Sequence, residues 1–114
     1  MKKFLATLFV SSVLSWNAFA HSPLQVTSPN DGAKLEAMPT EVTFTFKRNM
    51  RLTKVTSTHN GSDANSLDLN GQTSFATEFQ IPFSANSVGE YTIEWRGLGD
   101  DGHAQKGSFV FTVE

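Results

Sequence analysis

Hydrophobic and polar residues alternate in short segments along most of this chain. The clearest segment is 41–46, where Val42, Phe44 and Phe46 alternate with polar residues. Successive side chains of a β-strand point to opposite faces, so this alternation predicts a strand with one buried face. Similar patterns predict further strands at 24–27, 54–58, 63–70, 74–83, 89–95 and 108–113. No segment shows convincing helical periodicity.

Turn-forming residues separate the predicted strands at intervals of about eight to twelve residues, as is typical of all-β domains. The sequences SPNDG at 28–32 and NG at 60–61 are the clearest turns, because proline, asparagine and glycine favour turn geometry. Between the strands, we expect segment 33–40 to be a linker and segment 47–53 to be a polar loop.

About seven short alternating strands predict an all-β fold. The expected architecture is a seven-stranded antiparallel Greek-key β-sandwich, immunoglobulin-like or cupredoxin-like. The apolar strand faces would pack against each other between two sheets. The predicted core comprises Phe44, Phe46, Tyr91, Ile93, Trp95, Phe109 and Phe111.

The first residues have the pattern of a bacterial secretory signal peptide. Lys2 and Lys3 precede a short apolar segment, and AFA at 18–20 is a small-x-small cleavage signal. The apolar segment is shorter than the roughly 20 residues of a membrane-spanning helix. We therefore expect residues 1–20 to be cleaved on export to the periplasm, with no stable membrane insertion afterwards.

Cleavage would leave one small domain, residues 21–114. The whole chain has 9 basic and 11 acidic residues, and the leader contains two of the lysines. The remaining domain is mildly acidic and its sequence shows no basic patch, which argues against nucleic acid as a partner. The chain has no cysteine, which excludes thiolate metal sites and cysteine nucleophiles.

A candidate metal site combines the new N-terminus with a glycine-rich turn near the C-terminus. Asp101 and His103 are separated only by Gly102, and in extended backbone this spacing points both side chains to one side. After cleavage, His21 would offer a free α-amine and a ring nitrogen to the same ion. Nitrogen and oxygen ligands in a tetragonal arrangement suit Cu(II). Asp100 is an alternative ligand, or a hydrogen-bond partner of one.

Several motifs of the chain resemble those of the CopC family. The resemblance covers the domain and is carried by His21 at the cleavage point, SPNDG at 28–32, YTIEWR at 91–96, DGH at 101–103 and GSFVFTV at 107–113. It is strong at both ends and thin between residues 47 and 83.

This resemblance implies a periplasmic copper carrier with a seven-stranded sandwich. We expect no enzymatic activity, because no nucleophile–base pair is recognisable in the sequence. It implies that His21, Asp101 and His103 bind Cu(II), for copper homeostasis or resistance. The partners it implies are the copper ion and either an inner-membrane copper transporter of the CopD type or a periplasmic multicopper oxidase. We expect a monomer.

Some family members also have a methionine-rich loop that binds Cu(I). This domain has only Met38 and Met50, well apart in sequence, so we do not expect a Cu(I) site. We expect His59, beside an Asn-Gly turn, to be exposed and not a ligand. Two other interpretations stay open: an immunoglobulin-like structural or adhesion module without metal, and a small copper oxidase with a histidine brace.

Overall fold

The computed structural model describes residues 24–84 and 87–114, and every regular element in those ranges is a β-strand. The strands are β1 (Leu24–Ser28), β2 (Ala33–Leu35), β3 (Glu41–His59), β4 (Asn65–Ser66), β5 (Ala76–Pro82), β6 (Gly89–Gly99) and β7 (Ala104–Val113). The predicted all-β, seven-stranded fold is confirmed. The predicted leader and His21 lie outside the described residues. In the described ranges, no helix is long and apolar enough to cross a membrane.

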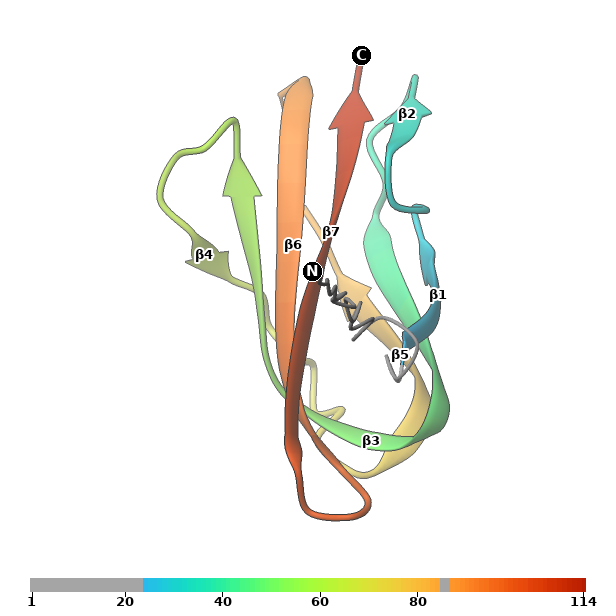
Figure 1. Ribbon diagram of the computed structural model, residues 1–114. Helices are drawn as coiled ribbons and strands as arrows, with labels where there is room; N and C mark the ends of the chain where they lie inside the picture. The colour runs from blue at the N-terminus through green and yellow to red at the C-terminus, as the bar shows by residue number, and fades with distance from the viewer. Residues whose placement is uncertain (1–23, 85–86) are drawn as a thin grey trace, which may run out of the picture.

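The strands form two packed layers that share one long strand. Along the sheet the order is β1-β3-β6-β7-β2, and β4 and β5 pair with β3 beside this path. The first half of β3 pairs with β1 and β5, and its second half pairs with β4 and β6. Figure 1 shows β3 bending across the lower end of the molecule, from one layer to the other. The two halves of β3 therefore belong to different layers.

The continuity of β3 differs from the predicted polar loop at 47–53. Met50 and Leu52 are buried in the core, each about 1% exposed. The register of β3 shifts twice, between Thr45 and Met50 against β5 and between Leu52 and Lys54 against β6. Extra residues at such bulges break the period-two pattern while the strand continues. The alternation of polar and apolar residues is therefore interrupted at 47–53, although β3 continues through this segment.

A second difference concerns the segment predicted as a linker, 33–40. Its first three residues form β2, which pairs in parallel with the end of β7, Ala33 opposite Phe111 and Leu35 opposite Val113. All other strand pairs in the described residues are antiparallel. A three-residue strand is too short to give a recognisable alternation.

The core lies between the two layers and is rich in aromatic rings. All seven core residues predicted from the sequence are buried, at 2% exposure or less. Phe46 of β3 meets Trp95 of β6 edge-to-face, with ring centroids 5.1 Å apart, and Phe44 meets Phe109 of β7 in the same way at 5.7 Å. Such aromatic pairs favour edge-to-face geometry and join the layers.

Candidate metal centre

The Asp101–His103 pair lies on the tight turn of the β6–β7 hairpin. The ladder of this hairpin runs from Gly89 opposite Val113 to Leu98 opposite Ala104. Figure 1 shows its turn at the end of the molecule opposite the C-terminus. The predicted glycine-rich loop is therefore much shorter than the sequence suggested, because both strands extend into it.

Backbone hydrogen bonds and one glycine define this turn. Gly102 N–H donates to Gly99 O at 2.9 Å, and Gly99 N–H donates to His103 O, also at 2.9 Å. Gly102 has φ +86°, a left-handed conformation in which glycine has no steric penalty. The turn reverses the chain over only a few residues, which places Asp101 beside His103.

The structure brings Asp101 and His103 into direct contact, as expected. His103 N–H donates to Asp101 Oδ1 at 3.0 Å, and His103 Nδ1 lies 3.1 Å from Asp101 Oδ2. The reason differs from the sequence argument, because the tight turn, not extended backbone, brings the side chains together. The hydrogen bond from the His103 backbone, and after it the one from the ring, hold the pKa of Asp101 below its usual value. The carboxylate is therefore kept ionised beside the imidazole.

The glycine before the turn leaves room for this carboxylate. A Cβ added at Gly99 would lie 3.0 Å from Asp101 Oδ1, closer than an ordinary van der Waals contact. Both site side chains stay open to solvent, His103 at 80% and Asp101 at 50% exposure. The pair is thus fixed in geometry while remaining accessible to an ion or a partner.

Asp100, the alternative ligand, has a different partner. Its Oδ1 accepts a hydrogen bond from an Arg48 guanidinium nitrogen at 3.2 Å. Arg48 lies on β3 within the segment predicted as a loop, and no local sequence signal connects it to the turn. The contact ties the hairpin turn to the part of β3 that crosses between the layers.

The side chains of the remaining candidate residues do not join this pair, although the backbone of Met50 is paired with Gly99 at the turn end of the β3–β6 ladder. His59 stacks on Tyr91 with ring centroids 4.6 Å apart, and its Nε2 lies 2.8 Å from Val88 O. Tyr91 is paired with His59 at the end of the β3–β6 ladder that lies opposite the turn. Met50 is buried in the core, and Met38 packs against it. The structure therefore brings none of these three side chains to the Asp101–His103 pair.

The geometry of the pair fits two ligands of one metal ion. Two ligand atoms about 2 Å from a metal and at right angles are about 2.8 Å apart. The Nδ1–Oδ2 separation of 3.1 Å is close to that value. Alternatively, Asp101 keeps its hydrogen bond to Nδ1 and leaves Nε2 of His103 as the ligand. Within the described ranges, no group of three or more His, Cys, Asp or Glu side chains could hold a metal.

The sequence and the fold of this chain are similar to those of known proteins. The profile of the CopC domain family matches residues 24–114. Similar solved structures include CopC from Methylosinus trichosporium OB3b, with 24% identity and a TM-score of 0.68, covering 82% of this chain and 94% of that one. No curated protein matches the sequence significantly.

Another similar structure is PcoC, a methionine-rich copper resistance protein from Escherichia coli. It has 23% identity and a TM-score of 0.58, covering 82% of this chain and 99% of that one. At these identities the solved structures show the fold alone. The family profile matches residues 24–114, which is most of the chain. The chain therefore belongs to the CopC domain family.

Proposed function

We propose that this protein is a periplasmic copper-binding protein that carries Cu(II) on His21, Asp101 and His103. The observation that carries the proposal is the exposed Asp101–His103 pair, with Nδ1 and Oδ2 3.1 Å apart on the hairpin turn. A nitrogen and an oxygen at this separation suit adjacent positions of a tetragonal Cu(II) site. Copper is here the cargo of the protein, in keeping with its family and with the copper resistance named for PcoC.

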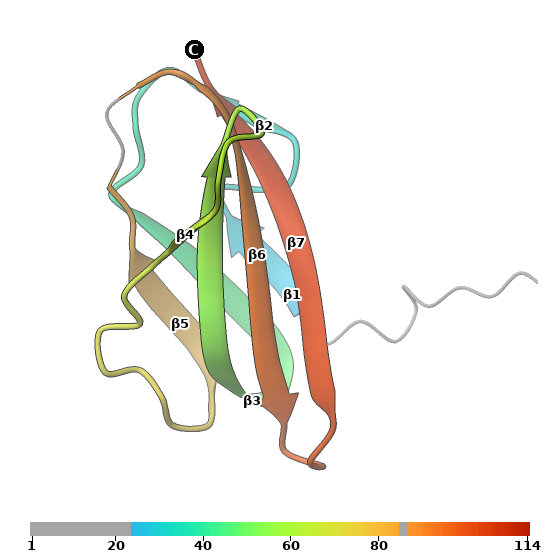
Figure 2. The same cartoon turned by 90° about the vertical axis from the view of Figure 1, so that its left-hand side faces the viewer.

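The start of β1 lies in the half of the molecule that carries this pair. Leu24, the first residue of β1, is paired with Phe46, and Arg48, two residues further, contacts Asp100 of the turn. Figure 2 shows the lower end of β1 in the same half of the sandwich as the β6–β7 turn, with the turn below it. His21 precedes Leu24 by three residues, which span at most about 10 Å, and the proposal requires that this length brings His21 to the turn.

Cleavage of residues 1–20 would make His21 a chelating residue. Its nitrogen is an amide before cleavage and a free amine afterwards, next to an imidazole on the same residue. Amine and imidazole lose their protons near neutral pH when a metal ion competes for them. Together with His103 and Asp101 they give three nitrogens and one oxygen, the set that Cu(II) favours.

We infer binding and transfer, not catalysis, as the role of this site. The exposure of His103 and Asp101 allows a partner to approach the ion directly. The receiving protein would be an inner-membrane copper transporter of the CopD type or a periplasmic multicopper oxidase. The same domain 21–114 would act as a monomer, for copper sequestration or delivery.

A Cu(II) titration of the protein starting at His21 tests this function. We expect one tight site per chain, strongly weakened by His103→Ala and Asp101→Ala and unaffected by His59→Ala. The His59 variant is a matched control because it removes an imidazole far from the turn. Equal weakening by the His59 and His103 variants would contradict the assignment. Absence of binding would favour a module without metal, and ascorbate-dependent oxygen consumption would favour an oxidase.

A further inference from the structure

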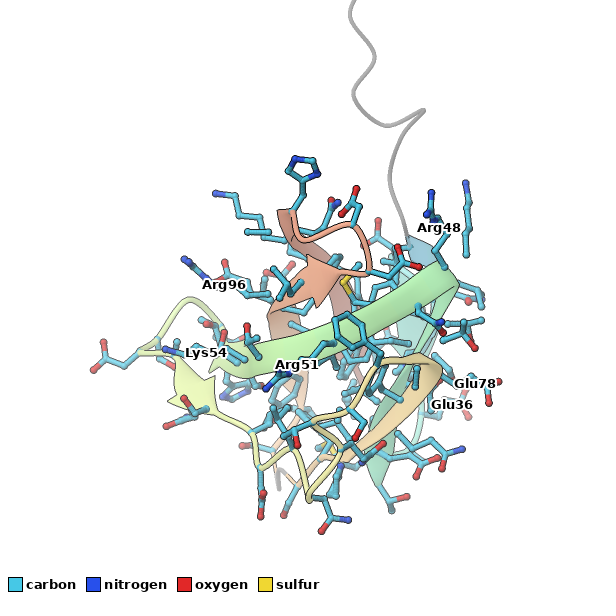
Figure 3. All side chains as sticks on the ribbon, turned by 90° about the horizontal axis from the view of Figure 1, so that it is seen from below. Glu36, Arg48, Arg51, Lys54, Glu78 and Arg96 are labelled. Carbon is cyan, nitrogen blue, oxygen red and sulfur yellow. The ribbon has the colours of Figure 1, made fainter. Side chains whose placement is uncertain are left out.

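The outer face of the β3–β6–β7 layer has three basic residues in one row. Lys54 of β3 is paired with Arg96 of β6, and Arg96 is paired with Lys106 of β7. Figure 3 shows Lys54 and Arg96 on one side of the molecule, and Glu36 and Glu78 on another. Directly opposite side chains on a sheet are about 5 Å apart at Cβ, and like charges at that distance destabilise the sheet. The row therefore has a cost that the fold does not explain.

Among the residues that the structure describes, the cations of this row form no ion pair with a carboxylate. Among the described residues, the ion pairs are Arg48–Asp100 and His103–Asp101, and neither includes a member of the row. Glu94 lies on the same face of β6, two residues before Arg96. In the described structure it forms no ion pair with the row. Three positive charges are thus available to an external ligand.

The row lies in a groove and not on a flat surface. A hollow of about 800 Å³ is lined by all three cations together with Thr56, Glu94 and Ser108. A second hollow of about 410 Å³ continues past Arg96 and Lys106 to Ala104. Ala104 directly follows His103, so this basic groove (Lys54, Arg96 and Lys106 with their neighbours) leads toward the hairpin turn.

The charge of the whole domain indicates which ligand fits. The described residues include seven basic and eleven acidic side chains. The net negative charge of the domain would repel a broad anionic surface such as a membrane. A narrow acidic segment would contact only the positive groove and would be attracted to it. Adjacent strands are about 4.8 Å apart, so the row spans about 10 Å. Two or three carboxylates of an extended chain cover that length, and Thr56 and Ser108 offer hydroxyl groups beside them.

We propose that the basic groove binds an acidic, extended segment of a partner protein. Bound there, the partner lies beside the hairpin turn, and its role in taking up or delivering copper rests on the function proposed above. This surface cannot be recognised from the sequence, because its three cations come from three different strands. They form one row only through the registers of β6 with β3 and with β7.

The test uses the metal-free domain 21–114 and a ten-residue peptide of alternating aspartate and serine. Nuclear magnetic resonance titration at low salt should give shifts at Lys54, Arg96 and Lys106 and their strand neighbours. The affinity should fall as salt is added, because exposed charges are screened. The double variant R96Q/K106Q should bind about five- to tenfold more weakly.

The matched control is K34Q/K47Q, which removes the same charge outside the groove. Equal weakening by both double variants would overturn the proposal in favour of non-specific attraction. Vesicles containing phosphatidylglycerol should not bind, and binding to them in preference to the peptide would also overturn it. The metal-site variant His103→Ala should bind the peptide normally, and R96Q/K106Q should titrate with Cu(II) normally. Failure of the groove and failure of the copper site are therefore distinguished.

Discussion

Asp101 and His103 are joined by two hydrogen bonds, one from the His103 backbone N–H at 3.0 Å and one involving its ring Nδ1 at 3.1 Å. The backbone bond is set by the hairpin turn and does not depend on the side chain of residue 103. The ring bond does. The contributions of these two hydrogen bonds to the pKa of Asp101 can therefore be separated by experiment.

The first prediction concerns the pKa of Asp101. A depressed carboxylate pKa stabilises the fold above the usual Asp value of about 3.9, and this contribution is lost as pH falls through the lower folded pKa. An NMR titration of Asp101 should therefore have its midpoint below the usual value. His103→Ala should raise the midpoint only in part, because the backbone bond, the larger cause, remains. An unchanged midpoint would show that the ring does not contribute.

The second prediction concerns copper binding and pH. Between about pH 7 and pH 5 protons compete with the metal for imidazoles and the α-amine, so Cu(II) affinity should fall steadily over this range. The Asp101 carboxylate, with its lowered pKa, stays ionised throughout. Competition titrations at several pH values measure this dependence. A constant affinity would indicate a set of ligands without histidine or amine.

The third prediction tests whether cleavage creates the chelate. A protein starting at His21 and one with an added methionine before His21 differ only in the nitrogen of that residue, amine or amide. The extended form should bind Cu(II) more weakly by orders of magnitude, because an amide nitrogen is a poor ligand until it loses its proton. Electron paramagnetic resonance should show a changed ligand field. Equal binding by both forms would leave Asp101 and His103 as the only supported ligands.

The fourth prediction concerns Phe46, which joins the two layers through Trp95. Phe46→Ala should reduce the free energy of unfolding by about 3–5 kcal/mol, because it leaves a cavity between the sheets. Chemical denaturation followed by tryptophan fluorescence measures this change. Phe75→Ala is the matched control, since Phe75 is 45% exposed and should cost much less. Similar losses for both variants would argue against the core described here.

The fifth prediction uses the close approach of Gly107 to Trp95. A Cβ at residue 107 would lie 2.8–2.9 Å from three atoms of the indole ring, which the core holds in place. Gly107→Ala should therefore destabilise the fold by about 1–3 kcal/mol, as overpacking of a core does. Ser108→Ala, on the exposed side of the same strand, should have little effect in the same denaturation experiment. A neutral Gly107 variant would mean that the indole can move.

The sequence alone predicted much of the fold because inward and outward residues alternate on most strands. Phe44, Phe46 and Trp95 were placed in the core by this period alone, since burial of every second residue is a local property of a strand. Asp101 and His103 were selected because residues two apart share one face of an extended strand. The two side chains do meet, but the hairpin turn and not extended backbone brings them together.

Other features were decided only by tertiary structure. The continuity of β3 past Met50 depends on bulges that match its register to β5 and β6, and bulges disturb the alternation on which sequence reasoning depends. The Arg48–Asp100 contact and the row of Lys54, Arg96 and Lys106 join residues from different strands. Strand register brings such residues together, and register is fixed by packing of the whole sandwich, not by any segment of the chain.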